Sequence, residues 1–285
     1  MLMRKLGAYV RLIRPVNCIM MGLAVIVGAV LVRGYEGAVF GANLVYGFVT
    51  GFTLTAASMA INDYYDRQID AVNEPERPIP SGTVKPRDAL IFALCLTVVG
   101  FAAAYFSSAF CFVTAIVAWA VFVLYTTVGK RSGLLGNFLV SLCVTIPFIY
   151  GSVTVIQTVK FNVLLFASMA FLSNTGREIT KGIVDVAGDE THGVKTLAVR
   201  FGEKAAAVAV MCFYVAAVVL SQLPWFLNLV SLWFIPPVVI ADLGLLVSST
   251  VLLRNYSREN ARKVKKITLL WFMFGLLAFV LGTVR

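Results

Sequence analysis

The sequence predicts an all-α polytopic membrane protein, in which nine transmembrane helices surround a central cavity that opens to the cytoplasmic side. Two observations predict this class. The 285-residue chain is 60% hydrophobic and only 13% charged, with a mean hydropathy of +0.89, whereas soluble domains are about 45–50% apolar and about 25% charged. The apolar residues also gather in nine long runs, and a run of about 20 apolar residues spans the hydrocarbon core of a bilayer.

Each run is bounded by a charge, a proline or a glycine-rich break, and each is too long for the strands of about 10 residues that form membrane β-barrels. The first run follows Arg14-Pro15 and lacks the small-residue cleavage pattern of a signal peptide, so we expect it to remain as a helix. All nine belong to one transmembrane domain that covers residues 1–285. The expected helices cover residues 16–32, 38–61, 89–107, 109–128, 134–155, 161–175, 205–222, 232–253 and 267–283.

The basic residues predict how these helices are oriented. Of the 24 lysines and arginines, 21 lie in the N-terminal segment and every second connection after it, and 3 lie in the other connections. Because the side rich in lysine and arginine faces the cytoplasm, we expect a multi-pass protein of the cell membrane with a cytoplasmic N-terminus and with Arg285 outside.

The net charge of +10 is concentrated at the expected cytoplasmic helix ends. This placement indicates the lipid bilayer and anionic substrates as partners, and no nucleic acid. The six basic residues of segment 254–266 are interpreted as a topology signal that also contacts lipid headgroups. The five cysteines lie singly in apolar runs, without a pair that could hold a metal, and are interpreted as packing residues.

The acidic residues gather in the connections 62–88 and 176–204, which lie on the same expected side of the membrane and hold 11 of the 14 aspartates and glutamates. The first connection begins Asn62-Asp-Tyr-Tyr-Asp66-Arg-Gln-Ile-Asp70. If the preceding helix continues, Asn62, Asp66 and Asp70 lie about one turn apart on one face. They form a short polar stripe at the cytoplasmic end of a membrane helix.

The second connection predicts a similar stripe, with Glu178, Lys181, Asp185 and Asp189 on one face of a continued helix. Stacked carboxylates repel one another, and two facing stripes of oxygen ligands suit Mg²⁺, which takes one or two carboxylates plus phosphate oxygens. A solvated acidic loop is the alternative for either cluster alone, but two such stripes on one side of the membrane favour a metal site.

Basic residues interleaved with the stripes supply the cations that a diphosphate needs. Three prolines exclude a helix over residues 73–82, and this stiff turn could hold its arginine toward the phosphates. Metal ions and cations around a diphosphate make it a leaving group. The candidate diphosphate-binding residues in the two connections are Arg67, Arg77, Arg177, Lys181 and Lys195.

The segment from Asn62 to Asp70, followed by Arg77-Pro-Ile-Pro-Ser-Gly82, resembles the first signature of the UbiA superfamily of intramembrane prenyltransferases. Asp185 and Asp189 resemble the second aspartate motif of that superfamily, and the resemblance covers the whole chain. Within the superfamily, Arg177-Glu-Ile-Thr-Lys181 is most similar to archaeal digeranylgeranylglyceryl phosphate synthases. Gly182 departs from those enzymes, which more often carry an acidic residue there.

The resemblance implies a magnesium-dependent enzyme that transfers a geranylgeranyl group from geranylgeranyl diphosphate to the hydroxyl of geranylgeranylglyceryl phosphate, in ether-lipid biosynthesis. Its partners would be a prenyl diphosphate donor and a phosphorylated, lipid-soluble acceptor. Tyr125-Thr-Thr-Val-Gly-Lys130 resembles a further family pattern, one residue longer here, and adds Lys130 to the diphosphate-binding residues. The expected catalytic residues are Asp66, Asp70, Asp185 and Asp189, and with Asn62 they are the expected metal ligands.

Two alternatives stay open. The first is a prenyltransferase that uses an aromatic or tetrapyrrole acceptor, because such an enzyme would carry the same motifs. An ion-coupled transporter would instead need charges in the middle of the membrane and internal repeats, and only Asp242 lies deep in an apolar run. Asp242 is therefore a functional candidate without an evident partner. His192, the only histidine, is interpreted as a solvated loop residue beside the second stripe.

Overall fold

The computed structural model describes residues 2–33, 41–127 and 129–284, which form helices joined by short turns. Nine helices in this part of the chain have at least 19 residues, and each coincides with one predicted apolar run. The long helices are α2 (Pro15–Arg33), α3 (Ala42–Asn73), α4 (Pro86–Ser107), α5 (Ala109–Thr127), α6 (Leu134–Ile156), α7 (Phe161–Val184), α9 (Leu197–Ser221), α11 (Ile235–Arg254) and α12 (Arg258–Leu281). The short ones are α1 (Leu2–Ile13), α8 (Val186–Thr191), α10 (Leu223–Phe226) and the 3-10 turns Gly129–Ser132 and Leu232–Phe234.

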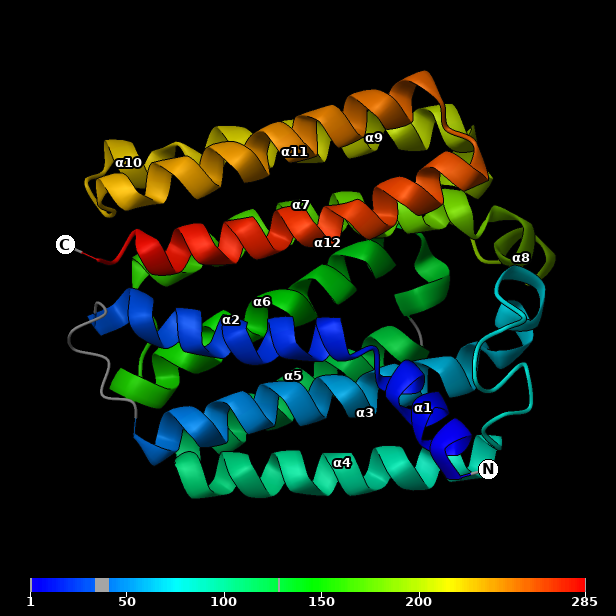
Figure 1. Ribbon diagram of the computed structural model, residues 1–285, viewed down its shortest axis with the longest axis horizontal. Helices are drawn as coiled ribbons and strands as arrows, with labels where there is room; N and C mark the ends of the chain where they lie inside the picture. The colour runs from blue at the N-terminus through cyan, green and yellow to red at the C-terminus, as the bar shows by residue number, and fades with distance from the viewer. Residues whose placement is uncertain (1, 34–40, 128, 285) are drawn as a thin grey trace.

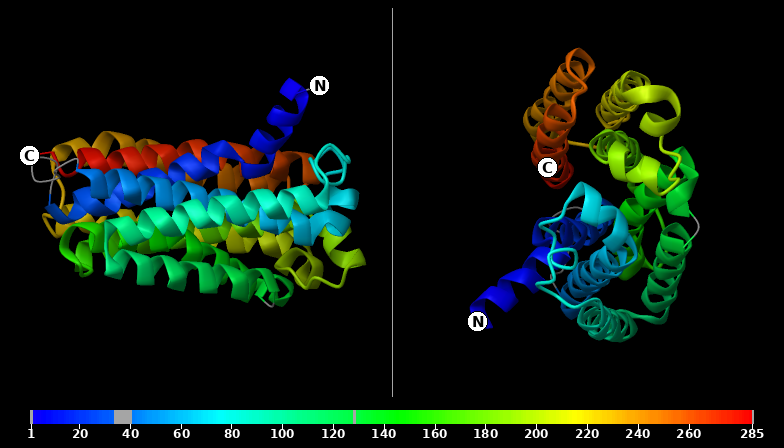
Figure 2. Two further views of the ribbon diagram at one scale, coloured as in Figure 1. Left: turned by 90° about the horizontal axis from the view of Figure 1, so that it is seen from below. Right: turned by 90° about the vertical axis from the view of Figure 1, so that its right-hand side faces the viewer.

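The long helices lie side by side and close into a ring (Figures 1 and 2). Each packs against the next long helix along the chain, and α12 returns to α2. Further contacts join long helices that are not consecutive, and the most extensive are between α2 and α6 and between α7 and α12. One end of the bundle carries α8 and the loop between α3 and α4, and the other carries α10 (Figure 1). We call the first of these the α8 end.

Eight of the nine long helices in the described residues are apolar enough to cross a membrane, and the exception is α7. α7 carries Arg177, Glu178 and Lys181 in its last two turns. It packs against α2, α6, α9 and α12, so its polar face meets other helices. A helix that protein surrounds in this way does not need an apolar surface all round.

Four helices extend beyond the predicted runs at the α8 end. α3 continues 12 residues past Ile61 to Asn73, and α7 continues from Thr175 to Val184. α9 and α12 begin earlier than predicted, at Leu197 and Arg258. Hydropathy marks only the apolar part of a helix, whereas the backbone hydrogen bonds continue into the polar part. The extensions of α3, α7 and α12 provide the candidate active site, whereas that of α9 is interrupted at Gly202, where φ is 84°.

Candidate active site

Asn62, Asp66 and Asp70 lie on the last turns of α3, as the sequence predicted. α3 continues without a break to Asn73, so the three residues share one helix face. All three side chains are buried. Burial of carboxylates requires partners, and the loop that follows α3 supplies one of them.

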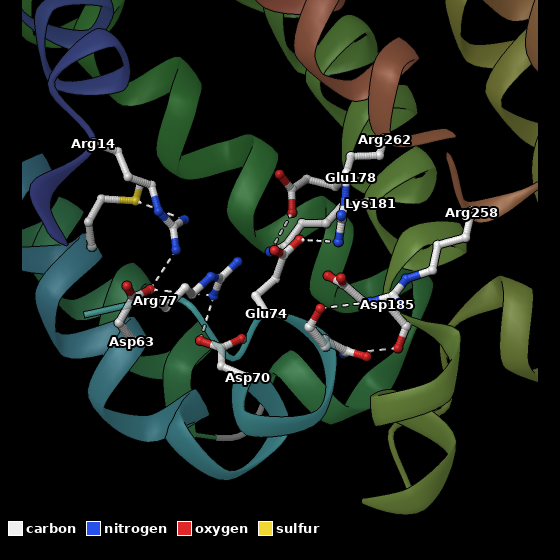
Figure 3. A network of polar contacts seen from close by, with 12 residues as sticks. Arg14, Asp63, Asp70, Glu74, Arg77, Glu178, Lys181, Asp185, Arg258 and Arg262 are labelled. Carbon is white, nitrogen blue, oxygen red and sulfur yellow. Dashed lines mark hydrogen bonds and ion pairs between the residues drawn. The ribbon is translucent and has the colours of Figure 1, made fainter. Parts of the chain in front are cut away.

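Two arginines pair with the carboxylates of α3. Arg77 Nη1 lies 2.5 Å from Asp70 Oδ2 and 3.6 Å from Asp63 Oδ1, and Arg14 Nη2 lies 2.5 Å from the same Asp63 oxygen (Figure 3). The predicted non-helical turn thus returns Arg77 to the stripe. Burial alone would lower the pKa of Arg77, but the carboxylates of Asp70 and Asp63 raise it above its ordinary value. Arg77 therefore remains a cation beside the aspartates.

The second stripe is not one continuous helix face, so that part of the prediction is wrong. α7 ends at Val184, Asp185 has φ −101° and ψ 5°, and α8 starts at Val186. Asp185 follows the end of α7, and Asp189 lies buried in α8. Glu178 also does not join Asp185 in an acidic stripe. Its carboxylate pairs with Arg177 at 3.3 Å and with Lys181 at 3.5 Å.

The ends of α3 and of the α7–α8 segment meet at Asn73. Asn73 Nδ2 donates to the carbonyl oxygen of Asp185 at 3.1 Å, and the Gly188 amide donates to Asn73 Oδ1 at 2.9 Å. Arg258 of α12 donates to the carbonyl oxygens of Val184, at 3.0 Å, and Asn73, at 2.7 Å. The two aspartate motifs are therefore held next to each other, as the sequence interpretation requires.

A cavity of about 350 Å³ extends from this end into the bundle. Polar and charged side chains gather in the part nearest the α8 end, and mostly apolar side chains line the rest, with Ser221 and Asp242 as polar exceptions. Tyr125 and Asn62 belong to the polar part, with Glu178 among several cations. The cations that line the cavity are Arg14, Arg77, Arg177, Lys181 and Lys265.

Three of the predicted diphosphate-binding residues thus reach the cavity, namely Arg77, Arg177 and Lys181. Arg67 instead folds back on α3, where Nη1 donates to the Tyr64 carbonyl at 2.7 Å and the guanidinium lies over the Tyr64 ring. Lys195 is exposed and does not line the cavity. The side chain of Lys130 lies outside the described part of the chain.

Arg14 and Lys265 are cavity residues that the sequence interpretation missed. The helix break at Arg14-Pro15 was the available signal for Arg14, whose φ of 52° is unusual for a residue other than glycine. Lys265 lies in segment 254–266, which was interpreted only as a topology and lipid signal. Arg258 and Arg262 of that segment also contact the site, since Arg262 pairs with Glu74 at 2.9 Å. The composition of segment 254–266 does not show which of its basic residues face the site and which face away from it.

Asp242 has partners that the sequence did not reveal. Its Oδ2 accepts from Ser221 Oγ at 2.7 Å and from Gln222 Nε2 at 3.1 Å. Asp242 and Ser221 line the same cavity from α11 and α9. His192 caps α8, with Nδ1 2.9 Å from the Gly188 carbonyl oxygen, and it does not line the cavity.

The aspartates fit a magnesium ion that binds together with phosphate. Among the described residues, no three histidine, cysteine, aspartate or glutamate side chains are close enough to hold a metal by themselves. Mg²⁺ commonly takes one or two carboxylates and completes its shell with substrate phosphates and water. Asp185 Oδ1 is buried without a hydrogen-bond partner in the described residues, which is costly unless a ligand satisfies it.

Comparisons with known proteins give matches over most or all of the chain. The model of the UbiA prenyltransferase family matches residues 21–281. The digeranylgeranylglyceryl phosphate synthase of Korarchaeum cryptofilum is 36% identical over 287 residues, which cover 99% of both chains.

Solved structures share the fold. A digeranylgeranylglyceryl phosphate synthase structure superposes with a TM-score of 0.71 at 29% identity, and the match covers 98% of both chains. A UbiA homologue from Archaeoglobus fulgidus, bound to GPP and Mg²⁺, has a TM-score of 0.66 at 16% identity, over 95% of this chain and 99% of that one.

Proposed function

The chain belongs to the UbiA prenyltransferase family, and on that premise we propose that it joins geranylgeranyl diphosphate to geranylgeranylglyceryl phosphate. The expected family and enzyme class are thereby confirmed. The proposal that this reaction is prenyl transfer from a diphosphate rests mainly on one structural observation. Asn73 ties two aspartate-bearing helix ends together, at the mouth of a cavity that is cationic near them and apolar beyond.

The diphosphate of the donor would lie between the two motifs. Asn62, Asp66 and Asp70 would hold Mg²⁺ on the α3 side, and Asp185 and Asp189 on the other. When bound, Mg²⁺ neutralises the diphosphate and makes it a better leaving group. The synthase relative and the homologue bound to GPP and Mg²⁺ support a prenyl diphosphate that binds with magnesium.

Arg77 and Lys181 would contact the diphosphate from opposite sides of the cavity. Fixed cations stabilise the negative charge that grows on the diphosphate as the allylic C–O bond breaks. Arg77 lies in the loop that follows α3, and its ion pairs with Asp70 and Asp63 already hold it at the cavity. Arg67 and Lys195 do not line the cavity and are not included in the proposed site.

The apolar part of the cavity would hold the isoprenoid chains. Aromatic rings line it, among them Phe148, Phe272 and Phe279, and ring faces attract a neighbouring carbocation. The acceptor hydroxyl oxygen then forms the new C–O bond to the allylic carbon. Diphosphate leaves with the electron pair of the broken bond, and the hydroxyl proton is released.

We also propose that all nine long helices cross the membrane and form one domain. α7 is the ninth, enclosed by other helices and therefore less apolar. The α8 end would face the cytoplasm, because the basic connections lie there. An odd number of crossings agrees with α2 beginning and α12 ending at opposite ends of the bundle (Figure 1). The cavity would then open to the cytoplasm.

The test is to incubate the purified protein with Mg²⁺ and labelled geranylgeranyl diphosphate, and to offer geranylgeranylglyceryl phosphate or a phenol as acceptor. We expect a lipid ether from the phosphorylated acceptor only, and none when the metal is chelated. Asp66→Asn and Asp185→Asn should each lower kcat at least about 100-fold in a folded protein. A prenylated phenol would overturn the proposed acceptor, and normal turnover in either variant would overturn the metal assignment.

A further inference from the structure

Lys265 of α12 lines the cavity, where the carboxylates of Asp185 and Glu74 act on its charge from beyond ion-pair distance. It forms no ion pair with any carboxylate in the described residues. Its neighbours differ, because Arg262 pairs with Glu74 and Lys263 pairs with Glu259 on the exposed side. A lysine turned into a cavity loses part of the hydration of its charge. An anionic ligand would restore that lost interaction.

The depth of Lys265 follows from the contacts of Arg258. Arg258 reaches the carbonyl oxygen of Val184, so the start of α12 is level with the end of α7. The two helices run in opposite directions (Figure 1). Lys265 and Arg177 each lie seven residues further into the bundle, about 10 Å at 1.5 Å per residue. Both line the cavity, so they form a pair of cations at one depth.

An apolar track starts at Lys265 and follows α12 along the cavity. Its residues are spaced by three or four positions and therefore share one face of the helix. They all line the cavity, and they are Leu269, Phe272, Leu276 and Phe279. A cation at the head of an apolar track matches a ligand with an anionic head and a long hydrocarbon chain.

The metal-binding motifs lie on other helices. The only acidic residue of α12 is Glu259, which is exposed and paired with Lys263. α12 therefore brings no carboxylate for Mg²⁺ into the cavity, and its contribution to phosphate binding is a cation. The donor diphosphate, by contrast, would need the aspartates of α3 and of the α7–α8 segment.

We propose that Lys265, together with Arg177, binds the phosphate of the acceptor lipid, and that the acceptor chain lies along the α12 track. This inference rests on the proposed function, because it requires a phosphorylated acceptor. Arg177, which the sequence assigned to the diphosphate, would instead contact the acceptor. The donor diphosphate would thus be bound by α3 and the α7–α8 segment, and the acceptor by α12 together with Arg177 of α7.

The experiment compares Lys265→Met with wild-type protein on two acceptors that differ only in the phosphate. We expect KM for the phosphorylated acceptor to rise roughly 10- to 100-fold, while KM for geranylgeranyl diphosphate stays within about twofold. The acceptor that lacks the phosphate should be used equally poorly by both proteins. Lys265→Arg should keep most of the affinity, and Lys266→Met, which removes the adjacent exposed lysine, should behave as wild type.

Calorimetric titration of the phosphorylated acceptor, without donor or Mg²⁺, should show the same loss of affinity in Lys265→Met. A rise in the donor KM with an unchanged acceptor KM would overturn the inference, and so would equal losses on both acceptors. Lys265→Gln, checked by size-exclusion chromatography, repeats the test if the methionine variant does not fold. Failure of wild-type protein to use the phosphorylated acceptor would overturn the proposed function itself.

Discussion

At the scale of single residues, Gly188 decides how closely the two aspartate motifs approach. A Cβ atom at this position would overlap the side-chain amide of Asn73. That amide joins α3 to the Asp185 carbonyl oxygen and to the Gly188 amide. The residue type at position 188 therefore controls the separation of carboxylates that lie more than 100 positions apart in sequence.

Gly188→Ala should consequently impair both catalysis and stability. Overpacking of a close contact costs about 1–3 kcal/mol, and a displacement of catalytic groups by about 1 Å lowers the rate by about 100-fold. We expect kcat to fall at least about tenfold, with a lower melting temperature in detergent. Gly182→Ala is the matched control, because its Cβ would lie 3.5 Å from the nearest atom, in Thr196. Equal activity of the two variants would contradict the proposed role of the Asn73 contact.

At the scale of helices, α2 and α6 pack with their backbones close together. A Cβ on Gly28 would overlap the Phe148 carbonyl oxygen, and one on Gly151 would overlap that of Val25. Small residues commonly allow such approaches between membrane helices, where association depends on packing. The contact between the non-consecutive helices α2 and α6 fixes one wall of the cavity.

We expect Gly28→Ala to lower the free energy of unfolding by about 1–3 kcal/mol, since the helices must separate to admit the methyl group. Gly7→Ala is the control, because a Cβ there would meet nothing within 4 Å. Thermal unfolding of both variants in the same detergent measures the difference. An unchanged melting temperature for Gly28→Ala would show that this contact does not constrain the bundle.

At the scale of the whole molecule, the proposed orientation can be tested by labelling. In a variant that lacks the five native cysteines, Glu76→Cys would place one thiol in the loop at the α8 end, and Asn228→Cys would place one at the α10 end; both native side chains are exposed. A membrane-impermeant maleimide added to intact cells should label position 228 and not position 76. In inside-out vesicles the pattern should reverse. Labelling of both from one side would contradict the odd number of crossings.

Sequence patterns located the helices and the first aspartate motif because both depend on local spacing. The apolar runs gave all nine long helices, and the one-turn spacing of Asn62, Asp66 and Asp70 predicted their shared face on α3. The same argument failed at Asp185, where α7 ends. Spacing gives the face of a residue only while the helix continues, and contacts with Asn73 and Arg258 accompany the break.

The amino-acid sequence by itself determined the membrane class, the family and the nine long helices that the described residues contain, because hydropathy, charge alternation and motif spacing are properties of neighbouring positions. It also predicted the residues proposed to hold magnesium. Only the tertiary structure decided which cations enter the cavity. Arg14 and Lys265 lie 251 positions apart in the chain, yet both line it, whereas Arg67 and Lys195 do not. The direction in which a helical side chain points depends on the packing of its helix against distant parts of the chain, and composition does not encode that packing.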